Sequence, residues 1–245
     1  MFVTEATLRP DPRADPAGYP YSIPAVRHLE RLRFTSPVTF FVGENGSGKS
    51  TLLEGIAGAF GLNPEGGTKH VRFATRPSHS TLFRDLKLTK TRPAPTDSYF
   101  LRAETFYNLA SVIEDPGDRR AYDLEAFGGQ SLHDRSHGEA FLALVLHRLR
   151  GNGFYCFDEP EAALSPMRQL ALLAAMRQLV LKGSQFIIAT HSPVLLAYPE
   201  ATIYLFGDGP PQPLEYRDTE HYQVTRAFLE NPERMLRELM REESV

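Results

Sequence analysis

The chain has 245 residues, of which 42% are hydrophobic and 23% charged, and its formal net charge is -3. These values are ordinary for a globular protein and give no overall signal for nucleic acid or an anionic membrane. The single cysteine, Cys156, excludes an intrachain disulfide, and no apolar run approaches the roughly 20 residues that span a bilayer. We therefore expect one cytoplasmic domain over 1–245, without direct membrane insertion.

The first third of the chain is predicted to pass from extended or turn structure to a strand and a helix. Five prolines disfavour regular helix over residues 1–24 and favour extended or turn structure there. Residues 25–36 predict a short helix followed by a strand. The apolar and β-branched run over 37–42 predicts a buried strand. A helix is expected over 50–60, because a glycine and then a proline follow it.

The middle of the chain is less regular. Residues 80–89 alternate roughly as a strand does, and residues 102–127 have helical character in part. We expect a small inserted helical subdomain at about 102–140. Seven basic residues face a single acid, Asp85, over 24 residues here. The favoured interpretation is a solvated face of a β subdomain, and the alternative is a surface for a nucleic-acid backbone. The basic residues are Lys69, Arg72, Arg76, Arg84, Lys87, Lys90 and Arg92.

The pattern is clearer again after residue 139. Ser165 and Pro166 predict the start of a helix, with the serine as its cap, that ends near Gly183. Strands thus alternate with helices at both ends of the chain, which predicts a parallel sheet covered by helices. The expected helices are 139–149, 166–182 and 219–243, and the expected strands are 154–157, 185–190 and 201–206.

One glycine-rich segment matches G-x-x-x-x-G-K-[ST]. Glycines let successive backbone N–H groups turn inward and surround phosphate oxygens, and the helix that follows points its positive end at the same anion. Lys49 can reach the β- and γ-phosphates, and the Ser50 hydroxyl can ligate Mg²⁺. The predicted ATP-binding residues of this loop are Gly43, Glu44, Asn45, Gly46, Ser47, Gly48, Lys49, Ser50 and Thr51.

Two carboxylates follow the apolar run that ends at Phe157. A buried strand would place Asp158 at its carboxyl end, beside the phosphate loop of a neighbouring strand. Asp158 is therefore a candidate for holding Mg²⁺, directly or through water. Glu159 is a candidate for orienting and deprotonating the attacking water.

At this point the sequence resembles the ABC-type ATPases, and among them the soluble predicted AAA family ATPases related to SMC-type proteins. The resemblance implies an α/β P-loop fold, with a mostly parallel sheet flanked by helices, an antiparallel β part and a small helical insert. It also implies an ATP-sandwich homodimer that hydrolyses Mg-ATP. The motifs that carry it, in order, are Gly43–Ser50, F-L-R-A-E at 100–104, S-H-G-E at 136–139, D-E-P-E-A-A-L-S at 158–165 and A-T-H-S-P at 189–193.

The resemblance gives roles to residues outside the phosphate loop. Ser136 and Gly138 would form the signature loop that meets the γ-phosphate bound by the other copy, although His137 and Glu139 depart from the usual S-G-G-Q. Read alone, this segment is only a helix cap. His191 resembles the switch histidine that senses the γ-phosphate and helps to hold the attacking water.

Two further predictions concern the metal and the adenine. The glutamine that the family carries between its two lobes is missing, and Glu104 stands where it is expected, so Glu104 is a third candidate ligand for Mg²⁺. An aromatic residue ahead of the phosphate loop usually stacks on adenine. Tyr19 and Tyr21 are both at a suitable distance, and Tyr21 is preferred; the alternative for either is core packing.

The work that ATP drives stays open between three functions. The first is a stand-alone soluble ATPase, in DNA maintenance or defence. The second is the ATP-binding subunit of a membrane transporter, against which the missing glutamine counts. The third is a nucleotide-gated binding clamp whose turnover is incidental.

Overall fold

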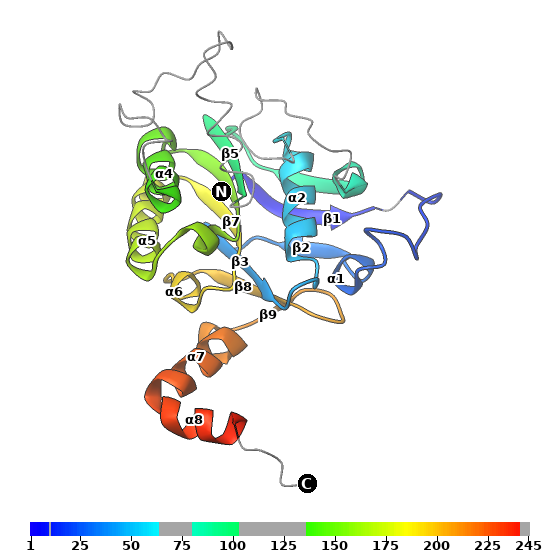
Figure 1. Ribbon diagram of the computed structural model, residues 1–245. Helices are drawn as coiled ribbons and strands as arrows, with labels where there is room; N and C mark the ends of the chain where they lie inside the picture. Colours follow the sequence, from blue (N-terminus) through cyan, green and yellow to red (C-terminus); the bar gives the residue numbers. More distant parts are fainter. Residues whose placement is uncertain (10, 64–79, 103–135, 241–245) are drawn as a thin grey trace.

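The computed structural model describes residues 1–9, 11–63, 80–102 and 136–240. Two β-sheets form the body of the domain, and helices lie on both faces of the larger sheet (Figure 1). Predictions that lie outside the described residues concern most of the insert at about 102–140, together with Glu104, Lys69, Arg72 and Arg76.

The larger sheet has the strand order β5-β6-β7-β3-β8-β9. Its first five strands are parallel, and β9 pairs with β8 in antiparallel fashion. Because the parallel strands share one direction, their carboxyl ends meet along one edge. The strands are β3 (Val38–Gly43), β5 (Asp97–Arg102), β6 (Gly153–Asp158), β7 (Gln185–Ala189), β8 (Thr202–Phe206) and β9 (Gln212–Pro213).

A smaller antiparallel sheet has the order β2-β1-β4 and is joined to the larger one through a side chain. The fully buried Gln185 accepts bonds through Oε1 from the backbone N–H groups of Phe2 and Val3, at 2.7 and 2.9 Å. Its Nε2 donates to the Val3 carbonyl at 2.8 Å. The side-chain amide of Gln185 therefore bonds to the backbone of the smaller sheet much as a neighbouring strand would. The strands are β1 (Val3–Leu8), β2 (Arg31–Arg33) and β4 (Leu86–Lys90).

The two faces of the larger sheet bury alternate residues of the same strands, as the pleat requires. On one face, Phe157 of β6 packs edge-on against Phe141 and Phe186. On the other face, Phe154 and Cys156 pack towards α2, whose Phe60 ring lies 4.3 Å from that of Phe154. This confirms the predicted α/β architecture of a mostly parallel sheet flanked by helices, with an antiparallel β part.

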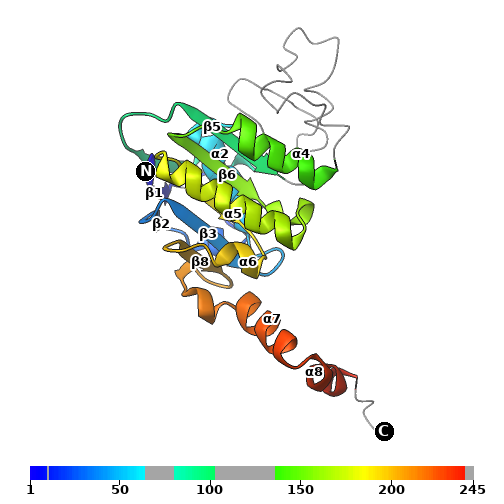
Figure 2. The same ribbon diagram turned by 90° about the vertical axis from the view of Figure 1, so that its left-hand side faces the viewer.

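The helices are divided between these faces, as two views show (Figure 1, Figure 2). Helices α4, α5 and α6 cover one face, and α2 lies on the other beside the smaller sheet. The helices of the body are α1 (Pro24–Arg27), α2 (Lys49–Phe60), α4 (His137–Ala143), α5 (Pro166–Leu181) and α6 (Pro193–Leu196), with the 3-10 turns η1 (Thr81–Arg84), η4 (Pro160–Ala163) and η5 (Tyr216–Asp218).

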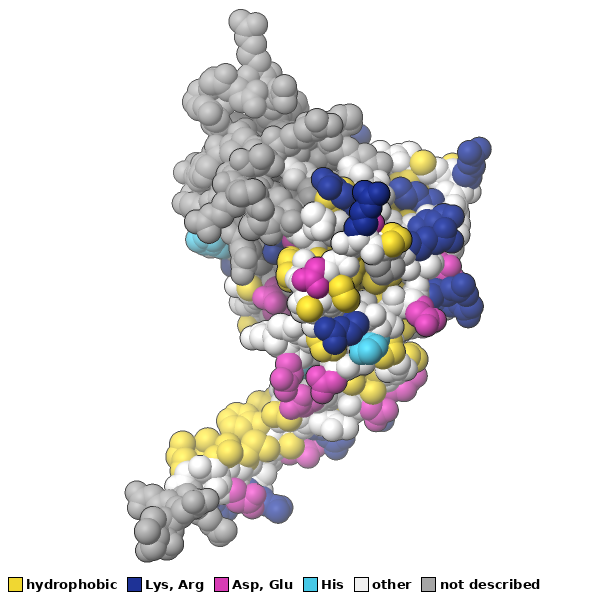
Figure 3. Space-filling view, turned by 90° about the vertical axis from the view of Figure 1, so that its right-hand side faces the viewer, with side chains coloured by type: hydrophobic (Ala, Val, Ile, Leu, Met, Phe, Trp, Pro, Cys, Tyr) yellow, Lys and Arg dark blue, Asp and Glu magenta, His cyan; other side chains and the backbone are white. Residues whose placement is uncertain are grey.

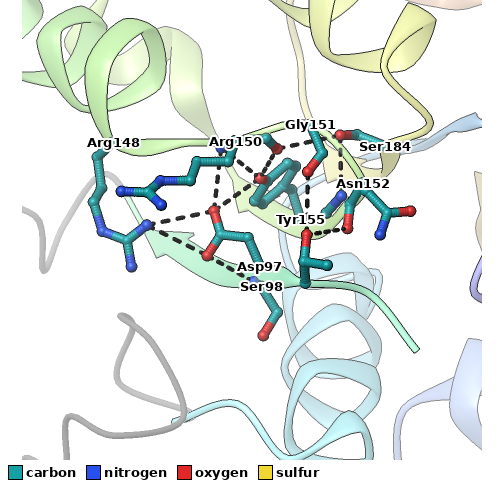
Figure 4. Close-up of polar contacts among 10 residues, drawn as sticks. Asp97, Ser98, Arg148, Arg150, Gly151, Asn152, Tyr155 and Ser184 are labelled. Carbon is teal, nitrogen blue, oxygen red and sulfur yellow. Dashed lines mark hydrogen bonds and ion pairs between the residues drawn. The ribbon is translucent and has the colours of Figure 1, made fainter. Parts of the chain in front are cut away.

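A polar cluster fixes the end of β5 and β6 that lies away from the phosphate loop (Figure 4). The Asp97 carboxylate accepts bonds from the Arg148 guanidinium at 3.3 Å and from the Arg150 backbone N–H at 3.2 Å. The Tyr155 hydroxyl donates to Asp97 at 2.9 Å. Burial, and next the charge of Asp97, raise the pKa of Tyr155 well above its ordinary value. These contacts hold the start of β6 in register without contributing to the phosphate-loop edge.

The chain ends in two helices that project from the body, α7 (Glu220–Glu230) and α8 (Pro232–Leu239). We call residues 220–240 the C-terminal arm. Neither helix contains a buried residue. Apolar side chains gather along the arm in the space-filling view, and Leu229 and Leu239 are 72% and 74% exposed (Figure 3). Within the described residues, no helix is long and apolar enough to cross a membrane.

The structure corrects three details of the predicted elements. Part of the segment 80–89 is the 3-10 turn η1, and only its end belongs to β4. Helix α4 stops at Ala143 and continues as the π-helical turn η3 (Leu144–Arg148). Ser165 stands at the N-cap of α5 but makes no side-chain capping bond.

Candidate nucleotide-binding site

The phosphate loop joins β3 to α2 at the carboxyl edge of the larger sheet. Gly43 and Gly48 both have positive φ angles, 146° and 100°. A Cβ at Gly43 would lie 2.3 Å from the Phe206 carbonyl oxygen, and one at Gly48 would lie 2.7 Å from the Ile23 side chain. Glycine is therefore required at both positions, which explains their place in the motif.

Lys49, the first residue of α2, lies under the loop. It is only 4% exposed, and its Nζ donates to the carbonyl oxygens of Gly43 and Glu44, both at 2.8 Å. Burial lowers the pKa of Lys49, while the charges of Glu159 and Asp158 oppose that shift. The ammonium group is therefore held at the loop by backbone oxygens, close to two acids that favour its charge.

Ser50 and Asp158 supply two oxygen atoms side by side. The Ser50 hydroxyl donates to Asp158 Oδ1 at 2.8 Å, and Asp158 is 6% exposed. The expectation that β6 would be the immediate neighbour of the loop strand is wrong, because β7 lies between β3 and β6. Hydroxyl and carboxylate oxygens are the donors that Mg²⁺ prefers, so the two residues fit the predicted metal. No group of three or more His, Cys, Asp or Glu suited to a metal occurs within the described residues.

Arg102, for which no role is predicted from the sequence, holds Asp158 from its other side. Arg102 ends β5, directly opposite Asp158 in the strand register. Its Nη1 lies 3.2 Å from Glu54 Oε2 on α2, and its Nε lies 3.5 Å from Asp158 Oδ2. The guanidinium thus bridges two carboxylates at the sheet edge. Arg102 is part of the quoted F-L-R-A-E motif, but only the strand order reveals its partners.

Glu159 turns away from the line of β6. Its φ and ψ of 49° and 52° are left-handed, which is uncommon for a residue other than glycine. Its backbone N–H still donates to the Ala189 carbonyl at 2.9 Å, so the turn is fixed against β7. The carboxylate is 41% exposed, and Oε1 lies 3.9 Å from His191 Nε2. The two residues predicted to act on water therefore face each other.

Glu161, which the sequence did not single out, ties the loop after β6 to the loop after β7. Its carboxylate accepts from the Thr190 hydroxyl at 2.7 Å and from the His191 backbone N–H at 2.5 Å. Burial raises the pKa of Glu161, and these two bonds oppose the rise. Glu161 therefore positions the backbone of His191.

His191 has a second partner that sequence reasoning missed. His191 Nδ1 and His221 Nε2, from the first turn of α7, are 3.0 Å apart. Burial lowers the pKa of both imidazoles. The charge of Lys49 lowers the pKa of His191 further, and the charge that His191 carries when protonated lowers that of His221 further, so both shifts favour the uncharged ring. No motif marks His221, which stands in a charged, amphipathic helix.

Two clefts open beside these groups. One, of about 460 Å³, is lined by the loop from Gly43 to Ser47 and by residues after β8. The other, of about 770 Å³, is lined by Glu44, Asn45, Glu159, Glu161 and His191 on one side and by Glu220, His221, Val224 and Thr225 of α7 on the other. The phosphate loop thus borders two spaces that could take a nucleotide, and the C-terminal arm forms a wall of the second.

The predicted signature residues lie at the start of α4, and neither Ser136 nor Gly138 lines these clefts. Glu139 Oε2 accepts from the Ser136 backbone N–H and hydroxyl at 2.9 and 2.7 Å, and Arg168 pairs with Glu139 Oε1 at 2.9 Å. A Cβ at Gly138 would lie 2.7 Å from the Ala163 carbonyl oxygen. The carboxylate that departs from the usual motif is therefore offset by an arginine.

The two tyrosines considered for adenine differ in burial. Tyr21 is 8% exposed and its hydroxyl bonds to Asp85, so its ring belongs to the core. Burial, and next the contact with Asp85, raise the pKa of Tyr21 to about 12. Tyr19 is 61% exposed, and its hydroxyl lies 3.5 Å from that of Thr51. Tyr19 is therefore the better placed of the two.

Two family models match parts of the chain. The model described as "AAA domain" matches residues 21–92, and the model described as "AAA domain, putative AbiEii toxin, Type IV TA system" matches residues 132–197. The first match includes the phosphate loop, and the second includes the signature segment, the acid pair and His191. The fold and these residues together define a P-loop protein.

Characterised relatives and solved structures point to one class of P-loop protein. The chain is 28% identical to the cobalt import ATP-binding protein CbiO of Salmonella typhimurium over 204 residues, which cover 76% of this chain and 73% of the relative. It is 28% identical to the hemin import ATP-binding protein HmuV of Pseudomonas fluorescens over 188 residues, which cover 69% and 72%.

The solved structures share the fold. The structure of cbiO1 from Clostridium perfringens matches 98% of this chain and 99% of its own, with a TM-score of 0.53 and 15% identity. The SMC head domain from Thermotoga maritima matches 88% of this chain and 100% of its own, with a TM-score of 0.50 and 16% identity. The two domain matches, the ATP-binding relatives and the shared fold together support a P-loop ATPase of the ABC type.

Proposed function

We propose that the chain binds Mg-ATP and hydrolyses it in a site that two copies complete. The observation that carries this proposal is the contact between the Ser50 hydroxyl and the Asp158 carboxylate at 2.8 Å. It joins the phosphate loop to the end of β6, so the predicted phosphate, metal and water-activating groups share one edge of the sheet. That arrangement suits phosphoryl transfer, in which positioning and charge stabilisation supply most of the catalysis.

Each residue then has a defined task. Lys49 and the loop backbone bind the β- and γ-phosphates. Ser50 and Asp158 would hold Mg²⁺, which when bound would offset negative charge on the phosphates. Arg102 keeps the Asp158 carboxylate in place. Glu159 takes the proton from the attacking water. His191 Nε2 lies 3.9 Å from the Glu159 carboxylate and would help to hold that acid in place.

The dimer is supported by where the signature residues lie. Ser136 and Gly138 stand at the N-terminus of α4, outside both clefts beside the phosphate loop. One chain therefore offers the two halves of the site in different places, and a second copy placed head to tail would bring them together. Because Arg168 pairs with Glu139, the extra carboxylate is compatible with a phosphate at that helix end.

The biological task we propose is that of a cytoplasmic stand-alone ATPase in DNA maintenance or defence. Arg84 and Lys87 are exposed on η1 and β4, where a nucleic-acid backbone could bind. The second candidate is an ATP-binding subunit of a transporter, which the import functions named for CbiO and HmuV favour. A permease encoded beside the gene would support transport. A nucleotide-gated clamp with incidental turnover is the third candidate.

The solution mass of Glu159→Gln tests the site and the dimer together. Blocking proton transfer to Glu159 should trap the closed pair, so this variant should be a monomer alone and a dimer with Mg-ATP, by light scattering after gel filtration. The matched control is the double variant Lys49→Ala/Glu159→Gln, which should stay monomeric because it lacks the phosphate-binding ammonium. A Glu159→Gln monomer with ATP shown to be bound would contradict the sandwich.

A further inference from the structure

The C-terminal arm reaches the candidate site through one residue of its first turn. His221 Nε2 lies 3.0 Å from His191 Nδ1, and the ring centroids are 5.2 Å apart at an angle of 50°. The remaining ring nitrogens, His191 Nε2 and His221 Nδ1, are buried without a hydrogen-bond partner among the described residues. One nitrogen of His191 is therefore occupied, and the other is buried and lies 3.9 Å from Oε1 of Glu159, which lines the same cleft as His191.

The first turn of α7 is fixed although the rest of the arm is exposed. Thr219 is 1% exposed; its hydroxyl donates to the Tyr216 carbonyl at 2.7 Å and accepts from the Tyr222 backbone N–H at 3.3 Å. The Tyr216 hydroxyl donates to the carbonyl of Pro193, two residues after His191, at 3.0 Å. Hydrogen bonds through Thr219 and Tyr216 thus hold the segments that carry the two histidines together, in addition to the contact between the rings.

The contact restricts where His191 carries its proton. A bond between two neutral imidazoles needs one N–H donor and one bare nitrogen. If His221 Nε2 donates, His191 is protonated on Nε2 and presents an N–H to Glu159 Oε1, 3.9 Å away. If His191 Nδ1 donates instead, a bare lone pair faces that carboxylate, which is repulsive. The acid in the cleft therefore favours the first arrangement.

We propose that His221 is a positioning residue that fixes the tautomer and orientation of His191, so that an N–H donor is directed towards the Glu159 carboxylate. The imidazole would thereby hold in place the carboxylate that is proposed to act on the attacking water. This inference deepens the proposed function and rests on it for the catalytic consequence. The contact between the two histidines, and the tautomer that it sets, do not depend on whether ATP is hydrolysed.

A consequence for the arm follows from this contact. The same turn that carries His221 also lines the 770 Å³ cleft through Glu220, and Val224 and Thr225 of the next turn line it as well. A shift of α7 would release His191 Nδ1 and change the donor that the site presents. The arm is thereby a structural part of the site and not an appendage to it.

The test compares two substitutions of His221 in the full chain. His221→Leu removes the donor, whereas the amide Nε2 of His221→Gln can still donate to His191 Nδ1. Long-range ¹H–¹⁵N correlations of ¹⁵N-histidine-labelled protein distinguish protonated from bare ring nitrogens. We expect His191 to be protonated on Nε2 in the wild type and in His221→Gln, and the Nδ1-protonated tautomer to gain population in His221→Leu, where only the Glu159 carboxylate still favours Nε2.

Kinetics provide the second measurement. In His221→Leu, kcat should fall by roughly 10- to 100-fold, the range for partners that orient a functional histidine, while KM for ATP changes little. His221→Gln should restore most of kcat. His147→Leu, at an exposed histidine on η3, is the matched control and should resemble the wild type in both measurements.

Several outcomes would overturn the proposal. One is a wild-type His191 protonated on Nδ1, and another is an unchanged tautomer in His221→Leu. Equal losses of kcat in His221→Leu and His221→Gln, with the His191 tautomer kept, would mean that the substitutions act on the fold. If the wild type fails to hydrolyse ATP, the proposed function fails, and the tautomer comparison still decides the contact between the histidines.

Discussion

The sheet edge and the C-terminal arm line the same cleft, but they are held in place very differently. Lys49 and Asp158 are 4% and 6% exposed and stand on elements of the core. The arm contains no buried residue in either of its helices, and its Leu229 is 72% exposed. The phosphate-binding groups thus depend on the packing of the whole domain, whereas His221 depends on a few local bonds. Substitutions should be able to disturb one region without the other.

The largest expected effect is on turnover, at the sheet-edge side of this comparison. Lys49→Ala should lower ATP hydrolysis by more than about 100-fold, the scale for removing one group that stabilises developing charge. The fold should remain, because the lysine bonds only to carbonyls of its own loop. Unchanged turnover in the folded variant would refute the site assignment.

Mixing variants extends this experiment to the shared site. Ser136→Arg should be inactive alone, because a bulky cation would block the signature loop. A mixture of Ser136→Arg with Lys49→Ala should recover partial activity, since one composite site in the mixed pair keeps both wild-type halves. A mixture as inactive as its components would mean that Lys49 of one copy and Ser136 of the other do not form a composite site, contrary to the proposal.

The next effect is on stability and contrasts two phenylalanines. Phe157 is fully buried on β6, so Phe157→Ala should lower the free energy of unfolding by about 3–5 kcal/mol. Phe228 on α7 is 38% exposed, and Phe228→Ala should change it by less than about 0.5 kcal/mol. Urea unfolding measures both. A comparable loss at Phe228 would show that the arm is packed in solution, and the contrast between the regions would be lost.

The smallest expected effect is on how the free energy of unfolding depends on pH. The folded-state pKa values of His191 and His221 lie below the ordinary value, chiefly through burial, so the unfolded chain binds more protons as pH falls from about 7 to about 5.5. The two histidines therefore contribute stability at neutral pH that is lost on acidification. Glu161, whose pKa is raised, acts in the opposite sense.

Comparison of variants isolates the histidine contribution. Glu161, Glu220 and Lys49 all act on His221, and each is kept in His221→Gln. The free energy of unfolding of His221→Gln should therefore fall less steeply with acid than that of the wild type, by urea unfolding at matched pH values. Equal slopes would mean that the imidazole pair contributes nothing to the pH dependence.

Much of the fold and part of the site can be predicted because their signals are local. The phosphate loop needs glycine at 43 and 48 for steric reasons that act within a few residues. Apolar runs mark β3, β6 and β7 because these strands are buried on both faces. The acid pair was found for the same reason, since it ends such a strand.

The contacts that could not be predicted from the sequence depend on how segments distant in the chain pack together. Arg102 bridges Glu54 and Asp158 only because β5 pairs with β6 in one register. His221 meets His191 because α7 returns to the sheet edge, a path that no periodicity encodes. Tyr19 and Tyr21 are two residues apart, and only burial separates the one that packs from the one that is exposed.

The buried amide of Gln185 has a consequence for how the protein can be handled. It binds the backbone of Phe2 and Val3 across a sequence separation of more than 180 residues, so three hydrogen bonds hold the amino end of the chain against β7. A version shortened by its first three residues would leave this amide in the core with none of these three bonds. Trimming the amino end would therefore loosen β7, the strand whose end positions His191, from the opposite side of the molecule.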